Sequence, residues 1–250
     1  METRRAPHLR SRDRADELTG LQNRDAGLNS LTGLQFMNNR ILVVLPTRGR
    51  PWAAMEATAS IMKHSTGLAD LAICCDQTDP KPFFIEAPRV RCFYAHHLTF
   101  GQWVNSTVMR HINDYDWFTW AADDLRYLTP AWDVRVVAHS ELVVYGPDNI
   151  QNHRMATHPF FQARLPKQLG FVAPPVLKHG CLDVFVEGVA RELGSVAYDP
   201  ELQMDHLHHS VGRSSFDTTY REVDWPSDMA AWEQSIKPKL GHFAAKLRGI

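Results

Sequence analysis

Residues 118–124 read FTWAADD, an apolar run that leads directly into two adjacent aspartates. Aromatic and small residues of this kind are typical of a strand buried on both faces, as in the parallel sheets of α/β proteins. Asp123 and Asp124 would then lie at the carboxyl end of that strand, where open α/β sheets bind ligands. Neighbouring carboxylates repel each other, and a bound cation relieves the repulsion. The stretch predicts a metal and nucleotide site, although an acidic turn that merely ends a strand would give the same pattern.

The composition bounds the class of protein. With 250 residues, of which 44% are hydrophobic and 22% charged, the chain can form one large globular domain or two small ones. A formal net charge of −1 gives no bulk basic character that would favour nucleic acid. We expect no transmembrane span, because no sufficiently long apolar run is present. The four cysteines lack metal-ligand and disulfide spacing, and the N-terminus lacks the apolar core of a secretory signal, so we expect a cytoplasmic protein with reduced thiols.

Strand-like and helix-like segments alternate through the first part of the chain. The predicted strands are 41–45, 71–75, 90–94, 116–122 and a short one near 143–145. The predicted helices cover 51–64 and 100–113, and a third begins in N-cap and N1 style at Thr129 and Pro130. This alternation predicts an α/β fold with a mainly parallel, Rossmann-like central sheet and helices on both faces.

The remaining segments are less regular. Residues 1–38 are polar without a sustained period and are expected to form a flexible arm, which leaves 39–250 as a single domain. Residues 147–180 predict loops around a cleft, and 182–193 an amphipathic helix. An extended segment is expected at 196–207, and a final helix over much of 227–247.

Polar side chains end several of the predicted strands. They are Thr47, Arg48 and Arg50 after the first strand, Asp76 after the second, and Asp123 and Asp124 after the fourth. In a parallel sheet they converge on one edge, where arginines suit phosphate and carboxylates suit base or ribose donors. Carboxylate and phosphate charges about 4 Å apart repel by roughly 4 kcal/mol at an effective dielectric near 20. We therefore expect a divalent ion to bridge Asp124 to a diphosphate.

A pair of histidines supplies candidate nitrogen ligands. His206 and His208 share one face if their segment is extended. Oxygen ligands favour Mg²⁺ or Mn²⁺, and an added imidazole favours Mn²⁺. A zinc or iron site built from two histidines and a carboxylate is an alternative, and purely structural histidines are another. Asp183 opens the helix at 182–193, where an aspartate is ordinarily just a cap.

These motifs, in this order, resemble those of GT-A-fold glycosyltransferases of the broad family 2 kind. ILVVLPTRGRP at 41–51 looks like that family's first strand and nucleotide loop, and Asp76 like the aspartate that contacts the base. WAADDL at 120–125, followed by TPAWD at 129–133, is similar to the metal-binding carboxylate motif. Ala121 stands where the usual Asp-x-Asp motif has its first acid, which is a departure from the family pattern.

The later motifs resemble a branch of that family often found in bacteriophages. They are HGCLD at 179–183, YDP at 198–200, DHLH at 205–208 and DTTY at 217–220. The likeness covers residues 40–235, and it implies that Asp183 is the general base and that the histidines supply a metal ligand. It also implies a nucleotide-binding half over 39–145 and an acceptor and metal half over 146–250.

The resemblance implies a metal-dependent hexosyltransferase that moves a sugar from a nucleotide-diphosphate sugar, with UDP favoured, to a hydroxyl acceptor with inversion. Its expected nucleotide-binding residues are Thr47, Arg48, Arg50, Asp76 and Asp123. The expected ligands of Mn²⁺ or Mg²⁺ are Asp123, Asp124, His206 and His208. A modified DNA base, a virion protein and a glycan are all open as acceptors, as is the oligomeric state. Two alternatives remain: a metal-dependent hydrolase of nucleotide sugars or phosphoesters, and a non-catalytic nucleotide- or glycan-binding module.

Overall fold

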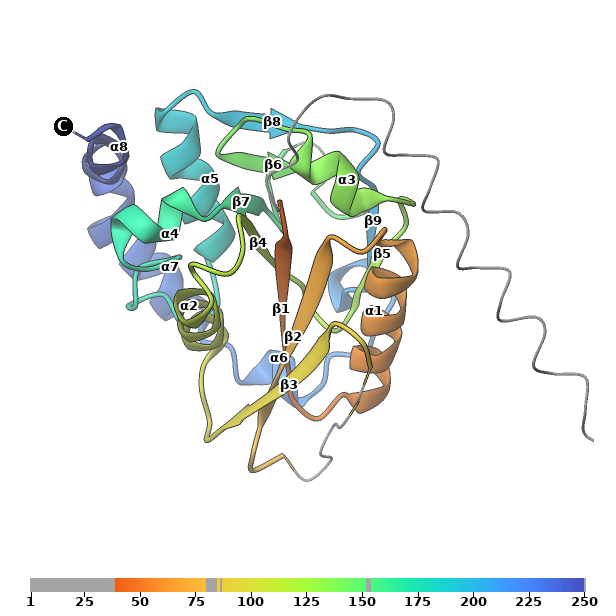
Figure 1. The fold of residues 1–250 in the computed structure, drawn as a ribbon. Coiled ribbons are helices and arrows are strands. Elements are labelled where there is room, and N and C mark those ends of the chain that lie inside the picture. Colours follow the sequence, from red (N-terminus) through yellow and green to blue (C-terminus); the bar gives the residue numbers. More distant parts are fainter. Residues whose placement is uncertain (1–38, 80–84, 86, 152–153, 250) are drawn as a thin grey trace, which may run out of the picture. The chain divides into compact units, whose positions relative to one another are not determined.

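A seven-stranded sheet forms the centre of the fold. The computed structural model describes residues 39–79, 85, 87–151 and 154–249, and the arm predicted at 1–38 lies outside them. The strand order is β3-β2-β1-β4-β7-β6-β8 (Figure 1). The strands are β1 (Ile41–Thr47), β2 (Ala69–Asp76), β3 (Val90–Ala95), β4 (Trp117–Trp120), β6 (Val143–Tyr145), β7 (Phe160–Gln162) and β8 (Val196–Tyr198). All pairs are parallel except those of β7, which runs antiparallel to β4 and β6, so the predicted mainly parallel sheet is confirmed.

Helices cover both faces of this sheet (Figure 1). The α-helices of the described residues are α1 (Pro51–His64), α2 (Phe100–Arg110), α3 (Trp132–Val137), α4 (Arg164–Leu169), α5 (Leu182–Glu192), α6 (Thr218–Arg221), α7 (Trp225–Ala231) and α8 (Leu240–Arg248), of which the short α6 packs against neither face. Pro51 opens α1, where its missing N–H costs nothing. Thr99 and Gln102 form a reciprocal capping box at the start of α2.

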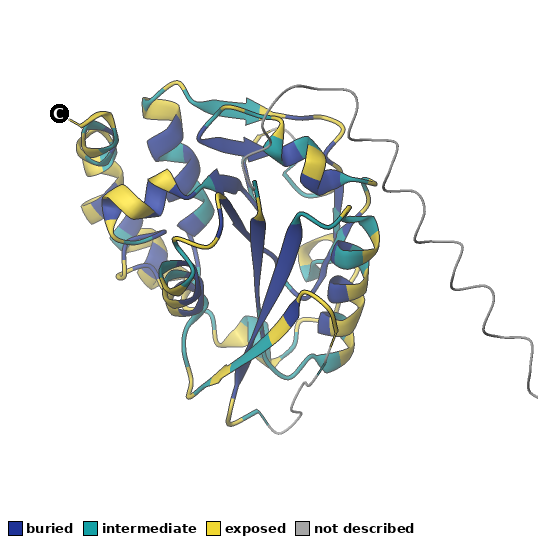
Figure 2. Cartoon of the chain, in the orientation of Figure 1, coloured by how far each residue is buried: buried dark blue, intermediate teal, exposed yellow. Residues whose placement is uncertain are grey.

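The central strands are buried on both sides, as Figure 2 shows for β1 and β2. Alternate side chains of β1 enter two separate apolar clusters. Leu42 and Val44 pack with α2, α4 and α5, whereas Ile41, Val43 and Leu45 pack with α1 and α3. This two-sided burial explains why the strand is a continuous apolar run instead of an alternating one.

A second, two-stranded ribbon sets the position of the candidate site. β5 (Leu125–Tyr127) pairs antiparallel with β9 (Met204–His206), and Leu125 lies opposite His206. The pairing continues beyond the strands, because Leu207 N–H donates to the Asp124 carbonyl at 2.8 Å. The residues just after β4 are thereby brought against a segment far along the chain.

Three local predictions need correction. The third helix begins at Trp132, after Ala131 in the left-handed region (φ 55°). Thr129 is not its cap, because its hydroxyl donates to the carbonyl of Glu201 instead. The region 147–180 is not loop alone, since it contains β7 and α4.

The C-terminal helix is interrupted. A π-helical turn (Trp232–Ile236) and a 3₁₀ turn (Lys237–Lys239) separate α7 from α8. Pro238 lies in the 3₁₀ turn, and its lack of an N–H prevents a regular α-helix from continuing through it.

Candidate metal and nucleotide site

The two adjacent aspartates face different partners. Asp123 turns toward the end of β1 and the loop after it, where it accepts from the Thr47 hydroxyl at 3.0 Å and from Arg50 Nη1 at 3.1 Å. Asp124 turns toward the C-terminal segments. Its Oδ2 accepts from the Tyr220 hydroxyl at 2.5 Å, and its Oδ1 lies 3.3 Å from His206 Nε2.

The different partners push the two pKa values apart. Burial raises the pKa of Asp123 to about 6, and the neighbouring Arg50 charge only partly offsets this. Burial also acts to raise the pKa of Asp124, but the contacts with His206 and Tyr220 outweigh it and hold that pKa well below the usual range. Asp124 is therefore the more acidic member of the pair: it stays ionised well below neutral pH, whereas Asp123 begins to take up a proton near pH 6.

Asp76 lies at the same edge, as the last residue of β2. Its Oδ1 accepts from the Thr78 N–H and hydroxyl at 2.8 and 2.7 Å, and its Oδ2 lies 3.4 Å from Arg48 Nε. Although burial opposes ionisation, these contacts lower the pKa of Asp76 to about 2. Asp76 and Arg48 thus meet as the parallel sheet predicts.

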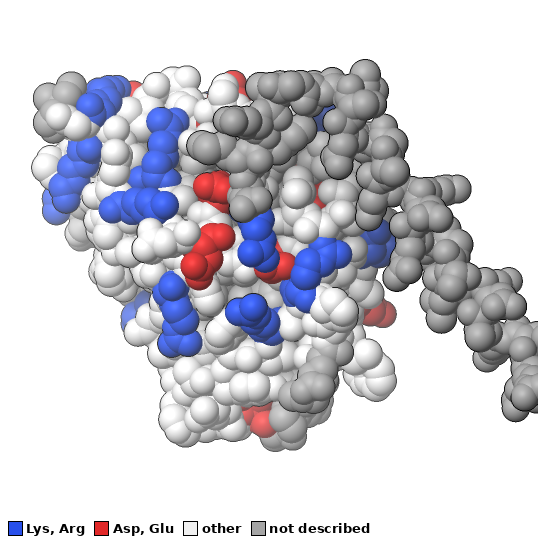
Figure 3. Space-filling view, viewed as in Figure 1, with Lys and Arg blue, Asp and Glu red and all other residues white. Residues whose placement is uncertain are grey.

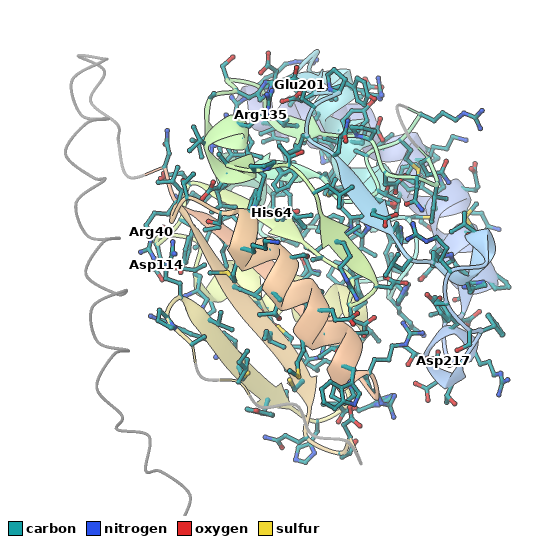
Figure 4. The ribbon with its side chains drawn as sticks, turned by 90° about the vertical axis from the view of Figure 1, so that its right-hand side faces the viewer. Arg40, His64, Asp114, Arg135, Glu201 and Asp217 are labelled. Carbon is teal, nitrogen blue, oxygen red and sulfur yellow. The ribbon has the colours of Figure 1, made fainter. Side chains whose placement is uncertain are left out.

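The segment around α6 covers both arginines of the first loop. Asp217, which caps α6, accepts two hydrogen bonds from Arg50, and Glu222 accepts one from Arg48 at 2.6 Å. The Arg50 guanidinium also lies over the Tyr220 ring, 4.3 Å from its centroid. Figure 4 shows Asp217 far from Arg40, which precedes β1, so α6 lies at the carboxyl end of that strand.

Of the two candidate histidines, His206 is the one that reaches Asp124. Burial disfavours its charged form, yet the facing carboxylates of Asp124 and Asp148 raise the pKa of His206 to about 9. The ring of His208 lies beside that of His206, with centroids 5.2 Å apart. Its Nδ1, however, lies 2.8 Å from the Ser210 hydroxyl. Burial, together with the charge of His206, lowers the pKa of His208 to about 4.

Asp183 lies in the first turn of α5, as predicted. It does not cap the helix, because the N-cap is Cys181 and Asp183 Oδ1 accepts from the neighbouring Val184 N–H at 2.8 Å. Burial raises the pKa of Asp183 to about 6, and the negative charges of Glu187 and Asp148 act in the same direction. A partly buried carboxylate with such a pKa is suited to accept a proton near neutral pH.

The donors around Asp124 fit a hard divalent cation that has only two protein ligands. In the described part of the chain, no group of three or more His, Cys, Asp or Glu side chains is arranged to hold an ion. Asp124 Oδ1 is buried and, among the described residues, has no hydrogen-bond partner. It faces the His206 nitrogen, which makes a carboxylate–imidazole donor pair. Mg²⁺ commonly binds through one or two carboxylates, with phosphate oxygens and waters completing its shell.

Some residues of the site were given no role from the sequence, although DTTY at 217–220 is among the motifs of the resemblance. Tyr220 bonds to Asp124, and Asp148 faces the second nitrogen of His206. Asp148 follows β6 as Asp123 follows β4, so the rule that ligands bind at strand ends could have identified it. Tyr220 lies on a four-residue helix, and nothing in its local pattern indicates where that helix packs.

The surface gives few further constraints. On the face seen in Figure 3, Lys and Arg side chains are spread widely and Asp and Glu side chains lie among them. None of the described helices is both long and apolar enough to cross a membrane.

Comparisons with known proteins identify the fold. No protein-family model matches the sequence, and no curated protein matches it. Glucosyl-3-phosphoglycerate synthase from Mycobacterium tuberculosis, solved with Mg²⁺ and UDP, superposes with a TM-score of 0.57 at 12% identity, covering 80% of each chain. Mannosyltransferase PcManGT from Pyrobaculum calidifontis, solved with GDP-Man and Mn²⁺, gives 0.52 at 12% identity over 84% of this chain and 74% of its own. S. aureus TarS 1–349 gives 0.53 at 9% identity over 80% and 74%. The chain therefore has the GT-A, Rossmann-like fold of these nucleotide-sugar transferases.

Proposed function

We propose that this protein is a metal-dependent glycosyltransferase that uses a nucleotide-diphosphate sugar, with UDP as the favoured nucleotide. The observation that carries the proposal is the pairing of Asp124 with His206 at the carboxyl edge of a GT-A sheet. Structural neighbours bind UDP or GDP-Man together with Mg²⁺ or Mn²⁺ in sites of the same fold. Mn²⁺ suits a donor pair that includes an imidazole.

Each residue of the edge has a proposed role. Asp124 and His206 would hold the cation, which when bound would neutralise charge developing on the departing diphosphate. Asp76 and Thr47 would contact the nucleoside. Asp123 would keep Arg50 in place, since it accepts a hydrogen bond from that side chain. Arg50 and Arg48 would be available to phosphate once the segment around α6, which now pairs with them, moves.

Asp183 is the proposed general base. Its carboxylate would take the proton from the acceptor hydroxyl as that oxygen attacks the anomeric carbon and the bond to the diphosphate breaks. Attack on the face opposite the leaving group inverts the anomeric configuration. The raised pKa of Asp183 brings its basicity closer to what proton transfer at neutral pH requires.

A thermal-shift screen tests the proposal. The full chain is heated with UDP-, GDP- and other nucleotide sugars, each with and without Mn²⁺, and stabilisation is expected only when both are present. Donors that stabilise the protein are then incubated with candidate acceptors, and the anomeric configuration of the product is determined. Release of free sugar to water at the full rate, with no acceptor needed, would indicate a hydrolase instead. Stabilisation without any turnover would indicate a binding module.

A further inference from the structure

The backbone of His206 is held by a residue that takes no part in the proposed reaction. Its N–H donates to Asn149 Oδ1 at 2.6 Å, and its carbonyl accepts from Asn149 Nδ2 at 3.0 Å. The side-chain amide thus pairs with both polar groups of the His206 backbone, as the backbone of an adjacent strand would. These two hydrogen bonds fix the backbone conformation at His206, and therefore the direction of its Cα–Cβ bond.

The two ring nitrogens of His206 face two different carboxylates. Nε2 lies 3.3 Å from Asp124 Oδ1, and Nδ1 lies 3.7 Å from Asp148 Oδ2. The ring is therefore positioned end to end between a carboxylate that follows β4 and one that follows β6. The second distance is longer than a hydrogen bond but within the range of an ion pair.

The Asp148 carboxylate is itself rigidly held. Its side chain is only 1% exposed. Oδ1 accepts from the N–H groups of Ile150 and Gln151 at 3.0 and 2.6 Å, and Oδ2 accepts from the Thr157 hydroxyl at 2.6 Å. A buried carboxylate with three donors has a fixed orientation, so it presents a stationary acceptor to His206.

The neutral ring of a second histidine, His158, also packs against His206. His158 packs edge to face against His206, with ring centroids 5.1 Å apart. It is buried. Burial lowers the pKa of His158 to about 3, so this ring limits the movement of His206 without adding positive charge.

We propose that Asp148 and Asn149 are positioning residues that aim Nε2 of His206 at Asp124, where the cation of the proposed function would be held. The inference rests on that function, because it takes Nε2 as a metal donor. A carboxylate that faces the far nitrogen of a metal-binding imidazole fixes the ring orientation, and its loss commonly lowers metal affinity about 10- to 100-fold. Neither residue would touch the sugar donor or the acceptor.

The test measures Mn²⁺ binding directly. The full chain with saturating UDP at pH 8 is titrated with Mn²⁺ by calorimetry, and electron spin-echo modulation reports whether an imidazole nitrogen is bound to the ion. Asp148→Asn is expected to lower Mn²⁺ affinity by about 10-fold or more and to weaken the nitrogen modulation. Asn149→Ala, which removes only the two hydrogen bonds to the His206 backbone, should also lower Mn²⁺ affinity and weaken the nitrogen modulation. Wild-type affinity and modulation in both variants would overturn the proposal.

Asp133→Asn is the matched control. Asp133, in α3, is also buried and accepts from the N–H groups of residues 66–68, which precede β2 and so lie at the opposite edge of the sheet. The Asp133→Asn variant should lose stability while keeping Mn²⁺ affinity and the nitrogen signal. If it lost as much Mn²⁺ affinity and nitrogen signal as Asp148→Asn does, the positioning role would be overturned. Failure of the proposed function gives a different result, because the wild-type chain would then show no UDP-dependent Mn²⁺ binding at all.

Discussion

Arg50 and Asp217 form a two-bond ion pair, in which Nε and Nη2 donate to the carboxylate oxygens at 2.7 and 2.6 Å. The same guanidinium donates to Asp123 from Nη1, so three of its nitrogens are engaged. The arginine predicted to bind phosphate is thus occupied by carboxylates of its own chain. A diphosphate that used Arg50 would have to replace Asp217.

Asp217→Asn is therefore expected to tighten UDP binding. An uncharged amide competes less well than a carboxylate for the guanidinium, and the gain should reach up to about 5-fold, or about 1 kcal/mol, for a partly exposed ion pair. The affinity is measured by calorimetric titration with UDP at constant Mn²⁺. Because a freed guanidinium would meet the phosphates, binding to the variant should also weaken more steeply as salt is added.

Glu222→Gln is the comparison for that variant. Its pair with Arg48 has side chains 47% and 37% exposed, and exposed pairs contribute little. UDP affinity should therefore change less than in Asp217→Asn. Weaker UDP binding by Asp217→Asn would show that α6 helps to hold the nucleotide instead of competing with it.

Asp124→Ala should remove the metal-dependent part of nucleotide binding. The variant loses the more acidic carboxylate of the pair, and with it the oxygen donor that faces His206. UDP affinity with Mn²⁺ should fall by at least about 10-fold, to the value measured without metal. Asp205→Ala is a suitable control, because Asp205 lies in the same ribbon but pairs with Arg213 at the surface. Unchanged UDP affinity of Asp124→Ala in Mn²⁺ would contradict the metal assignment.

The rate of transfer should depend on pH through Asp183. A base must be deprotonated to act, and burial raises the pKa of this carboxyl to about 6. Activity should therefore be present above pH 6, and kcat/KM should decline by at least about tenfold per pH unit below it, because Asp123 takes up a proton in the same range. The profile is obtained from initial rates at constant Mn²⁺ and saturating acceptor.

Asp183→Asn separates this catalytic role from a structural one. The amide keeps the shape of the side chain but cannot take a proton, so kcat should fall by about 100- to 10,000-fold. UDP affinity should stay close to that of the wild-type protein. Equal losses of turnover and nucleotide affinity would show that Asp183 serves the folding of α5 instead.

The sequence predicted those parts of the site that follow from local rules. Asp76, Asp123 and Asp124 end apolar runs, and parallel strands bring such ends to one edge, so their common location could be inferred before the structure. The ends of α1 were predictable as well, because Pro51 fixes its start.

The contacts that close the site depend on segments distant in the chain. Neither Tyr220 nor Asp217 carries a local signal of the residue it will meet, because the path of the chain between β9 and α6 decides that contact. The opposite orientations of Asp123 and Asp124 could not be predicted from the sequence either, because the neighbouring Leu125 pairs with the distant His206. The start of α3 is a further example, because no sequence signal indicated that Ala131 would adopt the left-handed region just before it.

Gly146→Ala should be among the most destabilising single changes near the site. Gly146 links β6 to Asp148, and a Cβ there would lie 1.7 Å from the carbonyl oxygen of Leu202. Backbone atoms cannot yield as a flexible side chain can, so we expect a loss of about 3 kcal/mol in the free energy of unfolding, measured by urea denaturation. Gly241→Ala is the control, because a Cβ at that position in α8 meets nothing within 4 Å. That variant should gain about 0.5 kcal/mol from helix propensity, and equal effects of the two changes would mean that β6 and Leu202 approach less closely than described.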